Sequence, residues 1–120
     1  MTDLESLAIE LRSWLIDHEM WMDVTIFFEG KSFSTCDDDG NFYYNDPDHL
    51  LVLFGEDPHC YTKYAGDLLT MIYEGPLYNL LNRGMPDPDL ISEFDAIFDK
   101  YGYYWTQGHA WDLTIHKKGS

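Results

Sequence analysis

Apolar residues near the start of the chain recur at intervals of three and four, which predicts an amphipathic helix ending near residue 18. Thr2 and Glu5 are spaced as a capping box, in which each side chain satisfies a free backbone N–H at the beginning of a helix. We expect one face of this helix to join the core through Leu4, Leu7, Ala8, Leu11, Trp14 and Leu15.

Beyond residue 22 the period changes to two, which predicts β-strands. Apolar and polar positions alternate over residues 23–28, and Gly30-Lys31 favours a hairpin turn with glycine first. A second strand is expected over residues 32–36. The sequence Asp39-Gly40-Asn41 then predicts a turn into a third strand over residues 41–44, which completes an antiparallel meander.

The middle of the chain is less regular. Residues 49–54, HLLVLF, fit either a helix that begins at Asp46-Pro47 or a buried strand, and the pattern does not decide between them. Residues 67–74 have an unbroken apolar run that predicts a strand. Gly75-Pro76 then predicts the start of a short helix that Gly84 closes.

The last third of the chain predicts a helix and a hairpin. Gly102 caps a helix near residues 88–101, whose apolar face holds Leu90, Phe94, Ile97, Phe98 and Tyr101. Two strands, 103–106 and 110–116, flank a turn at 107–109. The expected fold is a single α+β domain over residues 1–120, with an antiparallel β-meander packed against the N-terminal helix and the helix near 88–101, and a C-terminal β-hairpin.

Composition indicates a chain that folds in a reducing compartment. Hydrophobic residues make up 45% and aromatic residues 17%, which is too much apolar character for a disordered acidic tail. Cys36 and Cys60 have unrelated contexts and no framework spacing, so both are expected to be free thiols. The N-terminus lacks the pattern of a signal peptide and no apolar run reaches membrane-spanning length, so we expect a cytoplasmic protein without membrane contact.

Charge is the strongest signal in the sequence. Twenty-two acidic residues face seven lysines and arginines, which gives a formal net charge of −15. Solubility alone requires a charge of only about 2 to 8 for a small domain, and more destabilises the fold through self-repulsion. A generally acidic proteome, such as that of a halophile, is one explanation; an acidic binding surface is the other.

The acidic residues gather in two windows that contain no basic residue. The first lies between Lys31 and Lys63, and with the nearby Tyr44 it supplies our first set of candidate partner-binding residues: Asp37, Asp38, Asp39, Tyr44, Asp46, Asp48, Glu56 and Asp57. The second lies between Arg83 and Lys100 and supplies a second set: Asp87, Asp89, Glu93, Asp95 and Asp99.

Known catalytic and metal-binding patterns do not fit these windows. An EF-hand loop aligned on Gly40 would have Thr35 in its first position and Asp46 in its twelfth, and both are wrong for calcium. Of three spaced residues near the C-terminus, Asp112 and His116 would share a strand face while His109 points away, so no metal site is expected. No nucleophile or phosphate-binding motif occurs. We therefore predict a protein that is not an enzyme and uses no metal or cofactor.

The charge instead predicts a basic partner. Direct nucleic-acid binding is disfavoured because affinity for phosphates comes largely from Lys and Arg. Carboxylates two residues apart on a strand stand roughly 6.6 to 7 Å apart, which is comparable to successive phosphates of one DNA strand. Phe42 and Tyr44 are expected to contribute either to the core or to an interface.

In size, charge and its acidic and aromatic stretch at 37–48, the chain resembles the small acidic inhibitors encoded by phages and mobile elements, the anti-CRISPR and antirestriction class, several of which mimic nucleic acid. The resemblance implies that the protein occupies the DNA- or RNA-binding surface of a CRISPR effector or restriction nuclease. Two alternatives stay open: an immunity protein or antitoxin that neutralises a nuclease toxin, and a non-catalytic structural or regulatory module with an acidic surface.

Overall fold

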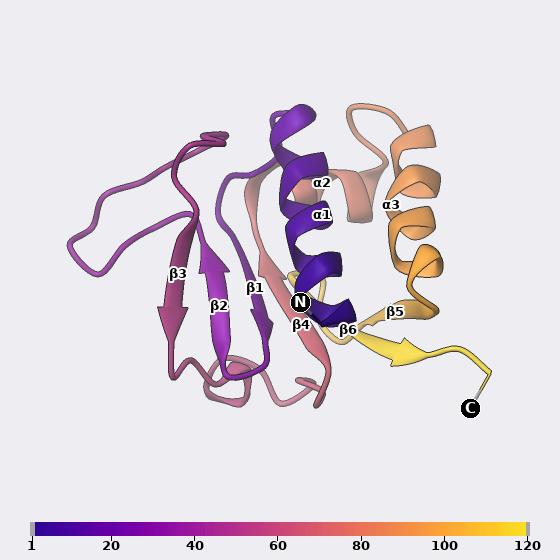
Figure 1. Ribbon diagram of the computed structural model, residues 1–120. Helices are drawn as coiled ribbons and strands as arrows, with labels where there is room; N and C mark the ends of the chain where they lie inside the picture. The colour runs from indigo at the N-terminus through magenta and orange to yellow at the C-terminus, as the bar shows by residue number, and fades with distance from the viewer. Residues whose placement is uncertain (1, 120) are drawn as a thin grey trace.

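Helices cover one face of a six-stranded antiparallel sheet (Figure 1). The computed structural model describes residues 2–119. The elements in chain order are α1 (Asp3–Asp17), β1 (Val24–Phe28), β2 (Lys31–Ser34), β3 (Leu51–Phe54), a 3₁₀ turn η1 (Pro58–Cys60), β4 (Leu69–Tyr73), α2 (Gly75–Arg83), α3 (Asp89–Lys100), β5 (Tyr103–Gln107) and β6 (Asp112–Lys117). The α+β fold, the N-terminal helix, the helix near 88–101 and the C-terminal hairpin are thereby confirmed.

The strand order β3-β2-β1-β4-β6-β5 places β1 and β4 at the centre and leaves β3 and β5 as the two edges. Helices α1 and α3 lie side by side in front of the sheet (Figure 1). Alternate strand residues point toward the helices and form the core with them, among them Ile26, Phe33, Met71 and Leu113. No helix within residues 2–119 is both long and apolar enough to cross a membrane.

The hairpin between β1 and β2 turns one residue earlier than Gly30-Lys31. Phe28 pairs with Lys31, so the turn consists of Glu29 and Gly30. Both have positive φ angles, 51° and 75°. Such a pair matches a type I′ turn, whose twist follows that of the flanking strands.

The third strand of the sheet is not residues 41–44, as the sequence pattern predicts, but β3. Residues 41–44 form only one isolated bridge, between Cys36 and Phe42. Of the two interpretations of residues 49–54, the strand is correct over Leu51–Phe54, although β3 is a partly exposed edge strand and not a buried one. No helix begins at Pro47; the Asp46 side chain accepts a hydrogen bond from the Asp48 N–H at 3.0 Å within a turn. Residues 35–50 are therefore a long loop between β2 and β3.

The segment 55–68 crosses the face of the sheet that the helices leave open. Tyr61 packs against Phe27, with ring centroids 5.4 Å apart. The Thr62 hydroxyl donates to the buried Asp112 carboxylate at 2.8 Å. These contacts tie the middle of the segment to the sheet, through Phe27 of β1 and Asp112 of β6.

Candidate functional site

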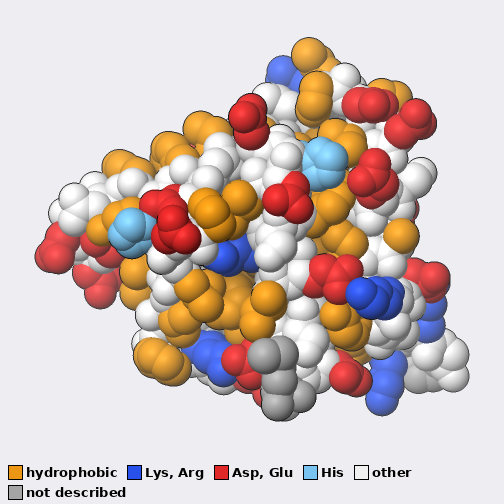
Figure 2. All heavy atoms as spheres, turned by 45° about the horizontal axis from the view of Figure 1, so that its top comes forward, with side chains coloured by type: hydrophobic (Ala, Val, Ile, Leu, Met, Phe, Trp, Pro, Cys, Tyr) orange, Lys and Arg blue, Asp and Glu red, His pale blue; other side chains and the backbone are white. Residues whose placement is uncertain are grey.

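The loop of residues 35–50, here called the acidic loop, projects beyond the edge of the sheet (Figure 1). It contains five aspartates and neither lysine nor arginine. Figure 2 shows carboxylates at the left end of the molecule, where this loop lies in Figure 1. A loop of sixteen residues with this charge needs attachments to keep a defined shape, and three sets of contacts supply them.

Arg12 of α1 makes the first attachment. Its Nη2 donates to the backbone carbonyls of Asp46 at 2.8 Å and His49 at 3.1 Å. The side chain is 8% exposed and its guanidinium lies 5.9 Å from the Trp21 ring. Burial lowers the pKa of Arg12, while the charge of Asp46 opposes that effect. A buried cation therefore binds the second half of the acidic loop to the first helix.

Asn45 makes the second attachment. Its Oδ1 accepts from the Trp21 N–H at 2.9 Å, and its own N–H donates to the Trp21 carbonyl at 3.0 Å. Asn45 adopts a φ of 53°, a region that asparagine enters more readily than most residues. The loop is thus paired with the connection between α1 and β1.

Tyr44, a member of the first candidate set, makes the third attachment. Its hydroxyl donates to Asp23 Oδ1 at 2.5 Å. This hydrogen bond and burial, together with the charges of Asp23 and Cys36, raise the pKa of Tyr44 to about 12. The hydroxyl is therefore engaged within the protein, and the ring packs against Phe42 at a centroid distance of 5.4 Å.

Asp37 shapes the tip of the acidic loop. Its carboxylate accepts hydrogen bonds from the Asp39 N–H at 3.0 Å, the Asn41 N–H at 2.8 Å, Asn41 Nδ2 at 3.1 Å and the Tyr43 hydroxyl at 3.3 Å. The bonds from Asn41, followed by those from Asp39 and Tyr43, outweigh desolvation and lower the pKa of Asp37. This carboxylate therefore maintains the turn and is less free to meet a partner.

Asp46 has a similar part in the second turn. It accepts from the Asp48 N–H and lies 2.5 Å from His49 Nδ1. The Asp48 N–H and the His49 ring, aided by Arg12, lower the pKa of Asp46, so the carboxylate is charged at neutral pH. The His49 ring also stacks on the Tyr43 ring, with ring centroids 4.7 Å apart, and this contact joins the two halves of the loop.

With these groups engaged, the acidic loop presents the exposed side chains of Asp38, Asp39 and Asp48 to solvent. Phe42 is 60% exposed and lies on the same loop. Carboxylates next to an exposed aromatic ring form the kind of mixed surface that protein interfaces use. These exposed carboxylates are the part of the first set that is best presented to a partner.

Glu56 and Asp57 lie at the other end of β3 and are separated from the acidic loop by that strand. Glu56 accepts from the Tyr61 hydroxyl at 3.2 Å, and Asp57 accepts from both the N–H and Nδ1 of His59 at 2.9 Å. These bonds lower the pKa of Asp57, the His59 N–H contributing most. The first set is therefore divided between the two ends of β3.

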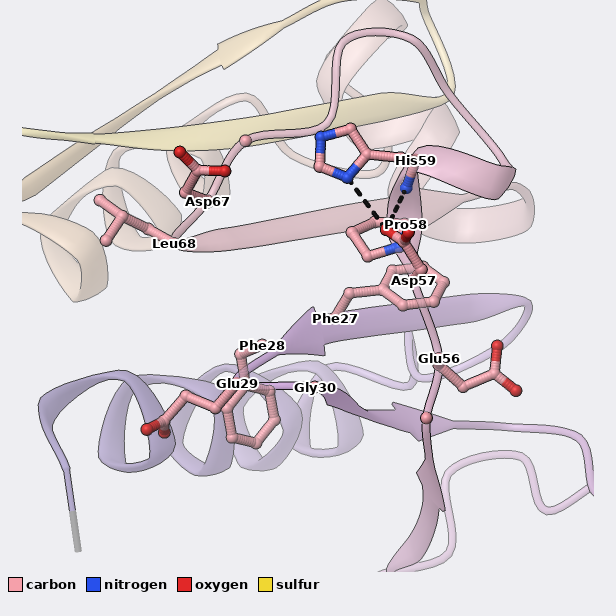
Figure 3. A pocket seen from close by; sticks show the side chains of 12 residues that line it. Phe27, Phe28, Glu29, Gly30, Glu56, Asp57, Pro58, His59, Asp67 and Leu68 are labelled. Carbon is pink, nitrogen blue, oxygen red and sulfur yellow. Dashed lines mark hydrogen bonds and ion pairs between the residues drawn. The ribbon is translucent and has the colours of Figure 1, made fainter.

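A pocket of about 360 Å³ opens beside Glu56 and Asp57 (Figure 3). Its lining includes Phe27 and Phe28 of β1 and the acidic residues Glu29, Glu56 and Asp67 (Figure 3). The hydrogen bond to Glu56, burial and nearby negative charges that include Asp38 raise the pKa of Tyr61. The Tyr61 hydroxyl is thus engaged by Glu56 within the protein.

The second candidate set lies on and before α3, which packs against β5 at the opposite edge of the sheet from β3. Three of its carboxylates have side-chain partners: Glu93 accepts from Trp14 Nε1 at 3.3 Å, Asp95 accepts from Trp105 Nε1 at 2.6 Å, and Asp99 pairs with Lys118. Asp87 caps the start of α3 through the Asp89 N–H at 2.9 Å. The structure does not bring the two sets together.

His109 does not point away from Asp112, as a strand position would require. It lies in the turn before β6, where its Nδ1 is 2.6 Å from Asp112 Oδ2 and its ring stacks on Trp111 at 4.5 Å. His116 is apart from this pair and bonds to Thr106 at 2.8 Å. Within residues 2–119, no group of three or more His, Cys, Asp or Glu side chains is arranged to hold a metal ion.

Sequence reasoning missed the residues that fix the acidic loop. Arg12 follows Ala8 by four positions and precedes Leu15 by three, so it lies on the apolar face of α1. A charged residue on an apolar face calls for a buried partner, and this signal was present in the sequence. No comparable signal pairs Asn45 with Trp21 or Tyr44 with Asp23.

Comparisons with protein-family models, curated proteins and solved structures found no match to this chain. Fold, charge and site geometry are therefore the basis for assigning a function.

Proposed function

We propose that the protein binds a basic nucleic-acid-binding protein through the acidic loop and inhibits it by occupying its DNA- or RNA-binding surface. The proposed target is a nuclease, a CRISPR effector or a restriction enzyme. The observation that carries the proposal is a set of exposed aspartates, Asp38, Asp39 and Asp48, on a loop that three internal attachments hold in place. A preorganised loop loses little conformational entropy on binding, which favours affinity.

The distribution of lysine ion pairs supports the choice of the acidic loop. Lysine ammonium groups pair with Glu5, Glu10 and Asp99, which all lie outside it. Arg12 contacts the loop through backbone carbonyls and is buried, so its charge does not cover the exposed carboxylates. The negative potential at the tip therefore faces solvent and can attract a basic surface over a Debye length of about 8 Å at physiological salt.

The positions of the acidic residues favour a binding surface over general acidity. No aspartate or glutamate occurs in the segments Val24–Phe28, Lys31–Ser34, Leu51–Phe54, Leu69–Tyr73, Gly75–Arg83 or Tyr103–Gln107. Asp112 of β6 is buried. A chain made acidic for solubility would have carboxylates on each exposed element, whereas this one concentrates them in loops and in α1 and α3.

The proposal is tested by affinity capture. The immobilised protein is incubated with a lysate that contains nucleases, washed at low and at high salt, and the retained proteins are identified by mass spectrometry. We expect retention of a basic nuclease at low salt, release at high salt, and loss of its DNA or RNA binding when the protein is added. The identity of the retained nuclease distinguishes a defence enzyme from a toxin.

The control is a pair of variants with equal charge changes. Asp38→Asn/Asp39→Asn/Asp48→Asn alters the acidic loop, and Asp87→Asn/Asp89→Asn/Asp99→Asn alters the opposite edge. Retention by the second variant but not by the first supports the proposal. If the first variant retains the nuclease as well as the unchanged protein does, or if nothing basic is retained at low salt, the proposed function is wrong.

A further inference from the structure

We propose that β3 is a docking edge to which the basic partner adds an extended segment as a further β-strand. The segment has an apolar centre and lysine or arginine residues on both sides. This inference deepens the proposed function, because it depends on that function for the charge of the partner. It concerns β3, at whose two ends the residues of the first candidate set lie.

The outer edge of β3 is open. Within residues 2–119, β3 pairs only with β2 and is the last strand on its side of the sheet. The Gly55 N–H bonds to the Gly30 carbonyl at 2.9 Å, which fixes the phase of the ladder between the two strands. In an antiparallel ladder, hydrogen-bonded residue pairs alternate with non-hydrogen-bonded pairs. The backbone N–H and C=O groups of Leu51 and Leu53 therefore bond to β2, and those of Val52 and Phe54 point outward.

The side chains of this edge also lack protection against pairing. Proteins usually protect an exposed edge strand with a lysine, a proline, a bulge or a covering segment. The sequence of β3 is LVLF, in which Phe54 is 78% exposed, and the preceding Leu50 is 48% exposed. An apolar edge with free backbone groups provides what strand addition uses: main-chain hydrogen bonds for affinity and side-chain contacts for specificity.

The charges on either side of β3 identify the occupant. Asp46 and Asp48 precede the strand, and Glu56 and Asp57 follow it. Hydrogen bonds from their neighbours lower the pKa values of Asp46 and Asp57, so both carboxylates are charged at neutral pH. A strand added here has its ends beside negative charge, and opposite charges on neighbouring strands stabilise pairing.

The same charges disfavour a second copy of this chain. Two β3 strands related by a twofold axis pair antiparallel, so the acidic start of one lies beside the acidic end of the other. If Val52 pairs with Val52 of the second copy, Asp48 of each copy lies opposite Glu56 of the other. Like charges directly opposite each other on adjacent strands are destabilising. The charges therefore favour pairing of β3 with a basic strand and disfavour its pairing with β3 of a second copy.

The test uses three synthetic peptides and the ¹⁵N-labelled protein. The probe is Lys-Lys-Val-Thr-Val-Thr-Val-Lys-Lys. The first control replaces all four lysines with glutamate, and the second keeps the lysines but carries N-methyl groups on alternate central residues. Binding is followed by amide chemical shifts and by hydrogen exchange of Val52 and Phe54. We expect the probe to slow exchange at these two amides and both controls to bind about tenfold more weakly, as the loss of two backbone hydrogen bonds or of charge pairing requires.

A pair of protein variants isolates the backbone contribution. Phe54→Ala removes the ring but keeps the outward N–H, whereas Phe54→Pro removes both, and proline is tolerated where an edge N–H faces solvent. After thermal unfolding has shown that both variants fold, the proline variant should bind the probe more weakly than the alanine variant. Equal binding by these two variants overturns the proposal.

The remaining outcomes separate this inference from the proposed function. If the N-methylated peptide binds as well as the probe, strand addition is wrong while attraction to a basic partner stands. If the glutamate peptide binds as well as the probe, the edge accepts strands but the basic partner is wrong. Concentration-dependent dimerisation that the Phe54→Pro variant abolishes identifies a second copy as the occupant and overturns the proposal.

Discussion

Arg12 donates a hydrogen bond of 2.8 Å from α1 to the backbone carbonyl of Asp46, across 34 residues of sequence. The bond connects the core of the domain to its most acidic loop. This buried cation interacts with the backbone of the loop and leaves the exposed carboxylates of Asp38, Asp39 and Asp48 uncovered. The loop thereby keeps both a defined shape and its negative charge.

Replacing Arg12 should therefore destabilise the fold and release the acidic loop. Arg12→Ala leaves the backbone carbonyls of Asp46 and His49 without their guanidinium donor, and hydrogen bonds to charged groups contribute about 1.5 to 3 kcal/mol. We expect the free energy of unfolding to fall by about 2 kcal/mol in denaturant titrations. Faster hydrogen exchange at residues 45–50 should accompany it. An unchanged unfolding midpoint would show that Arg12 does not hold the loop.

Asp37 and Asp38 are adjacent but have different roles in the loop, and substitutions should distinguish these roles. Asp37→Ala removes the acceptor for the amides of Asp39 and Asn41, so these amides should exchange faster with solvent. Asp38→Ala is the matched control, since it removes the same charge from an exposed side chain. Both are measured by amide hydrogen exchange. Equal protection in the two variants would contradict the assignment of Asp37 as the residue that shapes the turn.

Asp112 should make the protein sensitive to acid. Burial raises its pKa, but hydrogen bonds from the His109 N–H, the His109 ring and Thr62 outweigh that effect and lower it. A carboxylate with a lowered pKa in the folded state stabilises the fold above the unfolded value of about 3.9 and loses this contribution as pH falls through the folded value. Stability should therefore decline below about pH 4.

The control for acid sensitivity is the Asp112→Asn variant. It should lower the free energy of unfolding at pH 7 by about 2 kcal/mol, because Thr62 and His109 lose a charged acceptor. It should also reduce the decline of stability in acid, as measured by urea unfolding between pH 2 and pH 7. If the stability of the variant falls in acid as much as that of the unchanged protein, Asp112 is not the source of the acid sensitivity.

Tyr44 should titrate far above an ordinary tyrosine. Its hydrogen bond to Asp23 and its burial raise its pKa to about 12, so the neutral hydroxyl stabilises the fold below the unfolded value of about 10. This contribution is lost as pH rises toward 12. The difference in absorbance at 295 nm between the unchanged protein and Tyr44→Phe should rise near pH 12. A difference that rises near pH 10 would show that the bond to Asp23 does not form.

Local sequence patterns sufficed for the elements whose contacts are regular. The spacing of Leu7, Leu11 and Leu15 predicted α1, and that of Phe94 and Phe98 predicted α3, because a helix buries one face at a fixed period. The hairpins followed from alternation around short turns. These elements depend mainly on residues close in sequence.

The acidic loop could not be predicted in the same way. Residues 41–44 have the aromatic character of a strand, yet Tyr44 and Asn45 bond to Asp23 and Trp21, more than twenty residues earlier. Such pairings depend on the sheet order, in which β1 lies between β2 and β4. Local periodicity carries no information about strand order. The acidic side chains could be read from the sequence, but their division between the two ends of β3 could not.

The central claim is that the exposed carboxylates of the acidic loop, Asp38, Asp39 and Asp48, bind a basic partner. The most direct measurement is the affinity of the nuclease retained in the capture experiment for the unchanged protein and for the two triple variants, at several salt concentrations. Asp38→Asn/Asp39→Asn/Asp48→Asn should weaken binding about tenfold at low salt and reduce its salt dependence, whereas Asp87→Asn/Asp89→Asn/Asp99→Asn should leave both unchanged. Equal loss in both variants, or loss in the second alone, would contradict the claim.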